Sequence, residues 1–72
     1  MRLVLQKKDN SAFIEGLTGS WTRHREGAYV FANGLEALAC CFKWRLRSMK
    51  ILAIYRDPSL NFTVPVTDVR GD

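Results

Sequence analysis

The chain contains one stretch with the signals of an α-helix, and this stretch decides the fold class. It begins at the segment NGLE, where Asn33 can cap a helix while Glu36 reaches back to the Asn33 amide. Apolar residues continue at helical spacing, so the sequence predicts a helix from there to about Ser48. A chain with this single helix must build the rest of its core from strands.

Four short segments rich in apolar and β-branched residues flank the predicted helix, two on each side. Turn-forming clusters at 9–11 and 57–59 separate the members of each pair. The predicted strands are residues 2–8, 12–17, 49–55 and 61–66. The sequence therefore predicts an α+β domain, in which a small antiparallel sheet of about four strands, in ββαββ order, carries one helix packed on one face. No predicted element covers the other face of the sheet.

The remaining segments are a loop, an edge and a tail. Residues 18–27 are polar and flanked by glycine, apart from Trp21, and predict a loop or an irregular strand that leads into AYVFA at 28–32. Pro65 has no N–H to donate, so the last strand belongs at a sheet edge or turns the proline's side to water. We expect a single domain over residues 1–72 that frays at 66–72.

Length and composition set the class of protein. The chain has 72 residues, of which 47% are hydrophobic and 25% are charged, as in a small globular domain of marginal stability. Cys40 and Cys41 are adjacent and cannot form a long-range disulfide, which favours a reducing cytoplasm. The apolar run after Arg2 stops at Gln6, so we expect neither a signal peptide nor a membrane span.

The predicted helix has two apolar faces. At about 100° per residue, one stripe is assigned to the sheet-facing core: Leu35, Leu38, Ala39, Phe42 and Leu46. The opposite side carries Ala37, Cys41 and Trp44, where a soluble monomer normally has charge. Burying one large side chain contributes roughly 2–3 kcal/mol, so we expect this second face to be covered. Trp44 either folds over the sheet edge within a monomer or meets a second copy.

Self-association through this outer helix face is the first functional hypothesis. Trp44 would be its anchor, with Ala37 and Cys41 as close-approach positions and Lys43 and Arg47 as a polar rim. This predicts a small non-enzymatic binding or adaptor module that forms a homodimer. An unidentified protein partner remains an alternative occupant of the same face.

Nucleic-acid binding is the alternative function. The formal net charge is +4 and the isoelectric point is near 9.5. The candidate phosphate-binding residues are Arg23, Arg25, Lys43, Arg47 and Lys50, with Trp21 and Trp44 available to stack on bases. Positive charge at a helix C-terminus also complements the macrodipole, and no nucleic-acid-binding motif accompanies these residues. The alternative therefore ranks second.

The sequence predicts no enzyme, cofactor or metal site. His24 stands alone between two arginines, and the cysteines lack Cys-x-x-Cys spacing or histidine partners. The seven acidic residues are scattered singly, which leaves no paired carboxylates for acid/base chemistry. The tripeptide RGD at 70–72 matches a cell-adhesion motif, and chance is its simplest explanation.

A loose resemblance accompanies these features. It is carried by Trp21, Ala28, Phe31, Leu35 and Ala39, followed by ILAIYRDP and a closing FTVPV. Over roughly residues 12–66 the chain resembles a diffuse group of small bacterial proteins without assigned activity, some of them carried as mobile gene cassettes. The resemblance implies no site residues. The basic segment RHRE at 23–26 departs from the more acidic segment of that group.

Overall fold

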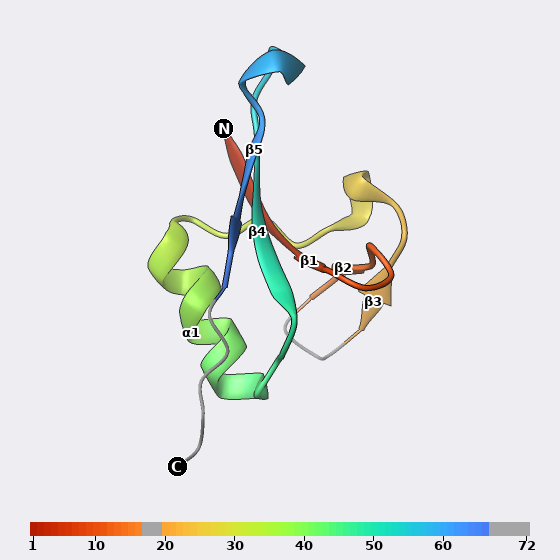
Figure 1. The fold of residues 1–72 in the computed structure, drawn as a ribbon, viewed down its shortest axis with the longest axis vertical. Coiled ribbons are helices and arrows are strands. Elements are labelled where there is room, and N and C mark those ends of the chain that lie inside the picture. Colours follow the sequence, from red (N-terminus) through yellow and green to blue (C-terminus); the bar gives the residue numbers. More distant parts are fainter. Residues whose placement is uncertain (17–19, 67–72) are drawn as a thin grey trace.

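The computed structural model describes residues 1–16 and 20–66, which form a five-stranded antiparallel sheet with one α-helix (Figure 1). The strands are β1 (Arg2–Lys7), β2 (Phe13–Ile14), β3 (Trp21–Thr22), β4 (Met49–Ile54) and β5 (Phe62–Pro65). The helix α1 spans Gly34–Trp44, and short 3-10 turns η1 (Arg25–Gly27) and η2 (Pro58–Leu60) lie in the connections. The predicted α+β class is confirmed. The additional strand, β3, lies in the segment for which the sequence leaves a loop or an irregular strand open.

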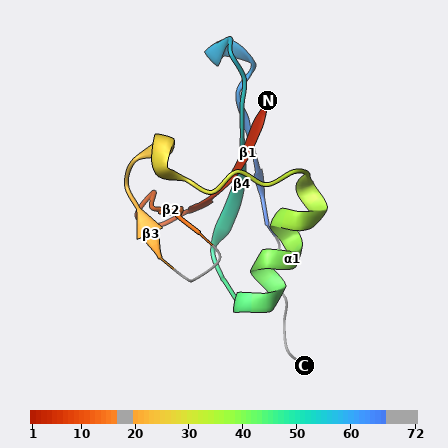
Figure 2. The same ribbon diagram turned by 180° about the vertical axis from the view of Figure 1, so that it is seen from behind.

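Both faces of the sheet are covered by other parts of the chain. Figures 1 and 2 show α1 on one side of β1 and β4 and η1 on the other side. On the η1 side, a smaller core cluster comprises Val4, Phe13, Ala28, Leu52 and Ile54. Ala28 directly follows η1, so the connection between β3 and α1 covers the sheet face that the sequence left over.

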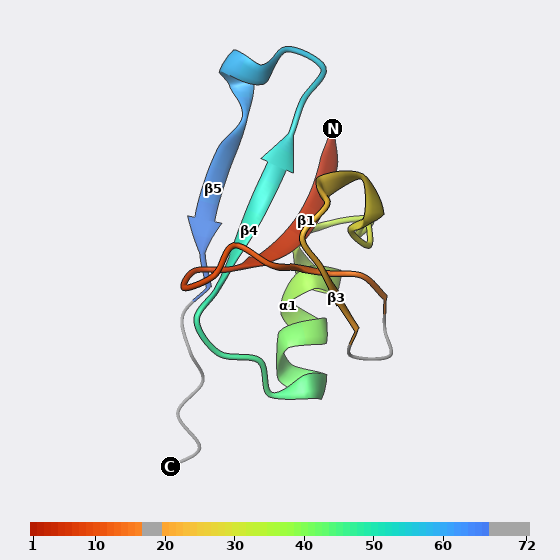
Figure 3. The same cartoon turned by 90° about the vertical axis from the view of Figure 1, so that its right-hand side faces the viewer.

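The first strand of the chain lies at the centre of the sheet, whose strand order is β3-β2-β1-β4-β5. β1 pairs with β4 along its whole length, from Arg2 opposite Ile54 to Lys7 opposite Met49. Its other edge pairs with β2 and, through a single bridge, with Phe31. Figure 3 shows β4 between β5 and β1. β1 therefore joins both halves of the sheet.

β5 is an edge strand, as Pro65 predicts. The Val66 amide donates to the Met49 carbonyl at 3.0 Å, so in an antiparallel ladder the backbone groups of Thr63 and Pro65 point away from β4. Proline at this outward position leaves no unpaired N–H there. Val66, where we expected fraying to begin, is buried in the core. Residues 67–72, with the RGD tripeptide, lie outside the described part of the chain.

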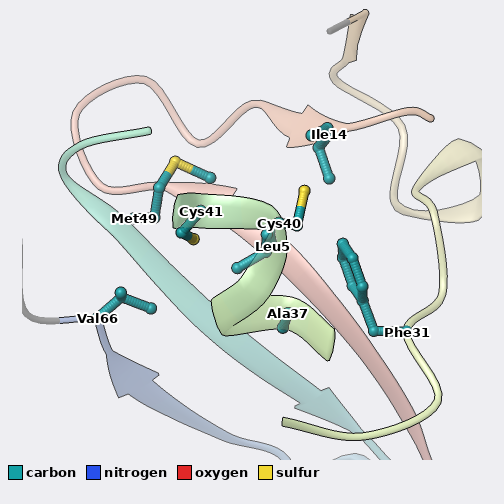
Figure 4. Close-up of a cluster of buried hydrophobic side chains, with 8 residues drawn as sticks. All are labelled: Leu5, Ile14, Phe31, Ala37, Cys40, Cys41, Met49 and Val66. Carbon is teal, nitrogen blue, oxygen red and sulfur yellow. The ribbon is translucent and has the colours of Figure 1, made fainter. Parts of the chain in front are cut away.

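The helix presents the opposite face to the sheet from the one that the sequence predicts. Ala37, Cys40 and Cys41 are buried, whereas Leu35, Leu38, Ala39 and Phe42 are exposed; only Leu46, beyond the helix end, packs against the core as predicted. The larger side chains of this core come from other elements: Leu5, Ile14, Phe31 and Met49 (Figure 4). These larger side chains fill most of the space between helix and sheet. The helix therefore contributes small side chains at this contact. The predicted sheet-facing stripe is therefore wrong.

The start of the helix forms the predicted capping box, except that the Glu36 side chain bonds to the amide one residue earlier than predicted. The Asn33 side-chain oxygen accepts a hydrogen bond from the Glu36 amide at 2.9 Å, and Asn33 has an extended backbone. The Glu36 carboxylate in turn accepts from the Ala32 amide at 3.1 Å, one residue before the predicted donor. The first bond satisfies a backbone donor that the first helical turn leaves free, and the second satisfies the amide of the residue before the N-cap.

The helix ends at Trp44, before the predicted Ser48, because Arg45 adopts a left-handed backbone with φ 51° and ψ 44°. The next amide, of Leu46, donates to the Cys41 carbonyl at 2.9 Å and closes the last turn. This reversal returns the Leu46 side chain to the core. The contact of Leu46 with the core thus stabilises Arg45 in the left-handed conformation, which glycine normally adopts at the end of a helix.

Replacing Arg45 by glycine should therefore stabilise the fold. A side chain in the left-handed region costs about 1–2 kcal/mol, partly offset by the greater freedom of glycine in the unfolded chain. We expect Arg45→Gly to raise the free energy of unfolding by about 0.5–1 kcal/mol, measured by chemical denaturation. Arg45→Ala removes the same charge but keeps the Cβ, so it should give no gain. Equal stability of the two variants would contradict the argument.

Candidate functional site

The exposed side of α1 carries an apolar stripe, which we call the outer helix surface. It consists of Leu35, Leu38 and Phe42, at positions i, i+3 and i+7, with Ala39 between them. The exposed fractions of the three large side chains are 78%, 36% and 59% in that order. Since the opposite side of the same helix is already buried in the core, this surface has no cover within the described chain.

β5 adds exposed apolar side chains on the same side of the sheet. Val64 pairs with Ile51 and Phe62 pairs with Ala53, and paired residues project from the same face. Ile51 packs against the cluster under α1, so this is the helix side. Phe62 and Val64 are both exposed. The side of the molecule that carries α1 therefore offers apolar groups from two elements.

The predicted self-association residues do not share one surface. Ala37 and Cys41 belong to the core of this chain, so the hypothesis that they contact a second copy is corrected. Trp44 is 41% exposed at the helix end, with the Lys43 ammonium 5.6 Å from its ring centroid. Arg47 is exposed beyond the end of α1. The outer helix surface replaces the predicted set.

A hollow of about 180 Å³ lies along one flank of α1. It is lined by Tyr29, Phe31, Glu36, Ala39, Cys40, Lys43 and Trp44. The rings of Tyr29 and Phe31 meet edge to face, with their centroids 4.9 Å apart. Glu36 and Lys43 therefore border the same flank, with the negative charge near the start of the helix and the positive charge near its end. This places charge of each sign beside the apolar stripe.

The five basic residues proposed for nucleic-acid binding do not lie on one side of the sheet. Arg25 lies in η1, across the sheet from α1, which carries Lys43 (Figures 1 and 2). Lys50 pairs with Gln6, in register with Val4 opposite Leu52, so it projects toward the η1 side. Arg47 follows the end of α1, and Arg23 follows β3. The sheet thus divides the predicted set.

Burial governs the chemistry of the Cys40 thiol. Removal from water raises the pKa of Cys40 above its ordinary value of 9.0, and the nearby Lys43 ammonium lowers it by a smaller amount. Neither Cys40 nor Cys41 forms a disulfide within the described residues. A raised pKa keeps Cys40 in the unreactive thiol form at neutral pH.

This shift predicts a loss of stability in alkali. Above pH 9.0 the unfolded chain releases the Cys40 proton while the folded chain retains it, so the free energy of unfolding falls as the pH rises through that range. Denaturant titrations below and above pH 9.0 should show this fall in the wild type. Cys40→Ala lacks the group and should show a shallower pH dependence. Identical slopes would refute the assignment to Cys40.

Other classes of site find no support in the described residues. Within residues 1–16 and 20–66, no group of three or more His, Cys, Asp or Glu side chains is arranged to hold a metal ion. In the described part of the chain, no helix has both the length and the apolar character needed to span a membrane. The described surfaces that remain are an apolar one on α1 and basic ones elsewhere.

No family model, no curated protein and no solved structure matches this chain. The resemblance to small bacterial cassette proteins therefore stays a prediction. Function has to be inferred from the surfaces of the chain itself.

Proposed function

We propose that this chain is a non-enzymatic protein-interaction module that forms a homodimer through the outer helix surface. The observation that carries the proposal is the exposure of Leu35, Leu38 and Phe42 on a helix whose other side is already buried. Covering apolar surface contributes about 25 cal/mol per Å², and soluble monomers rarely leave contiguous apolar patches uncovered. The two free thiols suit a reducing compartment, and we place the module in the cytoplasm.

The outer helix surface is shaped to meet a second copy of itself. A two-fold axis through Ala39 pairs the two helices in antiparallel orientation. With a rise of 1.5 Å per residue, Leu35 of one copy then lies about level with Phe42 of the other. Ala39, at the centre, has the small side chain that lets two helix backbones approach closely. The large residues at each end fill the space beside it.

The charges on the helix flank favour the same pairing. A two-fold axis perpendicular to both helices keeps a given flank of each helix on the same side of the dimer. Glu36 and Lys43 lie on one flank. Antiparallel pairing then brings Glu36 of one copy level with Lys43 of the second copy, to within about 1.5 Å along the helix axis, which is the rise of one residue. Each dimer gains this attraction twice. Opposite charges at the rim add orientation and specificity to the apolar contact.

The charge arrangement provides the test. Glu36→Lys and Lys43→Glu each place like charges opposite one another in a homodimer, and each should raise its dissociation constant about tenfold. An equimolar mixture of the two variants restores both attractive pairs in the heterodimer. Light scattering coupled to size-exclusion chromatography should therefore show a wild-type dimer, two weakened variants and recovery in the mixture.

This design separates pairing from folding. Glu36→Lys also loses the acceptor for the Ala32 amide, but that loss is the same alone and in the mixture. Recovery on mixing thus reports contacts between chains. A wild-type mass that stays monomeric at high protein concentration would overturn the proposal. Variants that dimerise as tightly as the wild type would overturn the antiparallel arrangement.

A further inference from the structure

A second hollow, independent of the outer helix surface, lies where β1, β2 and β3 end. Its volume is about 290 Å³, and it is lined by Lys7, Asn10, Ala12, Trp21, Thr22 and Arg23. These residues come from two stretches of the chain, 7–12 and 21–23. Antiparallel pairing of the three strands brings them together, and the chemistry of the lining is cationic and aromatic.

The strand register explains why the hollow exists. The Lys7 amide donates to the Ala12 carbonyl at 2.8 Å, and extending the β2–β3 register by one residue places Arg23 opposite Ala12. Lys7, Ala12 and Arg23 thus form one row across the sheet, with side chains on the α1 side. The small Ala12 side chain separates two long cationic ones whose strands are about 10 Å apart, at two strand spacings.

Trp21 supplies an aromatic wall beside this row. It pairs with Ile14 and packs against the α1-side core, so its ring projects to the same side as Lys7. The Lys7 ammonium lies 4.2 Å from the Trp21 ring centroid. Since the Glu15 amide bonds to the Ser20 carbonyl, the backbone N–H and C=O of Trp21 point outward from β3.

The polar groups around the hollow are mainly donors. Asn10 uses its side-chain oxygen to accept from the Ala12 amide, at 3.0 Å, which leaves its NH₂ group to donate. Thr22 uses its hydroxyl oxygen to accept from the His24 amide, at 3.1 Å. Within residues 1–16 and 20–66, no carboxylate forms an ion pair with Lys7 or Arg23. Two unpaired cations, an amide donor and an aromatic ring suit an anion attached to a flat ring.

We propose that this hollow binds a nucleoside phosphate, the unit shared by free nucleotides and single-stranded nucleic acid. The base stacks on the Trp21 ring in place of the Lys7 ammonium, which turns to the phosphate together with Arg23. Stacking of a base on an aromatic side chain contributes about 1–3 kcal/mol and tolerates different bases. This site uses a different basic set from the one that the sequence suggested, since it adds Lys7 and omits the residues that lie elsewhere.

Tryptophan fluorescence tests the proposal directly. In a Trp44→Phe background Trp21 is the sole tryptophan, and adenosine monophosphate and a short single-stranded DNA are titrated at about 50 mM and about 200 mM salt. We expect both probes to quench Trp21. Lys7→Ala and Arg23→Ala should each weaken binding about tenfold, whereas Arg25→Ala, an arginine in η1, should leave it unchanged.

Comparing the two probes at the two salt concentrations distinguishes free nucleotides from single-stranded nucleic acid as the ligand. Much tighter binding of the DNA than of the mononucleotide, with an affinity that falls steeply with salt, assigns the site to single strands. Equal affinities assign it to free nucleotides. Absence of quenching at low salt overturns the proposal, as does equal weakening by Arg25→Ala. Inorganic phosphate or an oligoglutamate peptide that competes as well as the mononucleotide overturns the role of the base.

Discussion

Replacing Leu5 by alanine should lower the free energy of unfolding by about 2–5 kcal/mol, because Leu5 is fully buried between α1 and the sheet. A 72-residue domain has little stability to spare, so the variant should be largely unfolded at elevated temperature. The matched substitution Leu35→Ala removes the same atoms from a side chain that is 78% exposed. It should change the free energy of unfolding by less than about 0.5 kcal/mol.

This pair of variants also tests the orientation of α1. The sequence pattern assigns Leu35 to the core, so on that assignment both substitutions would be costly. Urea denaturation monitored by circular dichroism, at concentrations low enough for a monomer, measures both values. A loss of more than about 2 kcal/mol in Leu35→Ala would restore the sequence-based assignment and contradict the outer helix surface.

Phe42→Glu should strongly weaken dimerisation while the chain stays folded. Phe42 is 59% exposed in the single chain, so the substitution leaves the core intact. In the proposed dimer it places a charge against apolar groups of the second copy, at a cost of at least about 2 kcal/mol, or about thirtyfold in the dissociation constant. Sedimentation equilibrium of wild type and variant measures this difference.

Leu60→Glu is the control for that experiment. Leu60 lies in η2 and is 57% exposed, so the substitution makes a similar chemical change away from α1. It should leave the dissociation constant unchanged. If Leu60→Glu dissociates the dimer while Phe42→Glu does not, the interface lies at η2 and the proposed one is wrong. Circular dichroism of both variants checks that each chain remains folded.

Most secondary structure could be predicted from the sequence because its signals are local. The capping box at Asn33 and the proline in β5 each act within a few residues, and the structure confirms both positions. β3 could be predicted only as one of two alternatives, a loop or an irregular strand, because its two residues, Trp21 and Thr22, stand among polar and glycine residues. Pairing with β2, rather than local propensity, makes them a strand.

The helix face could not be predicted because periodicity measures hydrophobicity but not available volume. Both sides of α1 are apolar, and the side with the larger residues has the stronger pattern. The space under the helix is set by Leu5, Ile14 and Met49, which reach it through long-range pairing. The small side chains of Ala37 and the two cysteines occupy that space.

The two candidate sites also differ in whether a local sequence pattern reveals them. The stripe of Leu35, Leu38 and Phe42 was visible in the sequence, but its side was assigned wrongly. The row of Lys7, Ala12 and Arg23 was not recognised, since it depends on the register of three strands. A hairpin register deduced from the turn at residues 8–11 would have placed Lys7 opposite Ala12, and this was the available signal.

The central position of β1 governs how the chain can acquire its structure. β1 precedes the other strands of the sheet in the chain, yet its principal neighbour β4 follows only after β2, β3 and α1. The pairing of Leu3 with Ala53 therefore closes a loop that contains β2, β3 and α1, and such non-local contacts slow folding. Until β4 has left the ribosome, β1 has one edge unpaired and its apolar side chains uncovered. A nascent chain of this protein thus cannot form the central strand pair of its sheet before residues 49–54 have been synthesised.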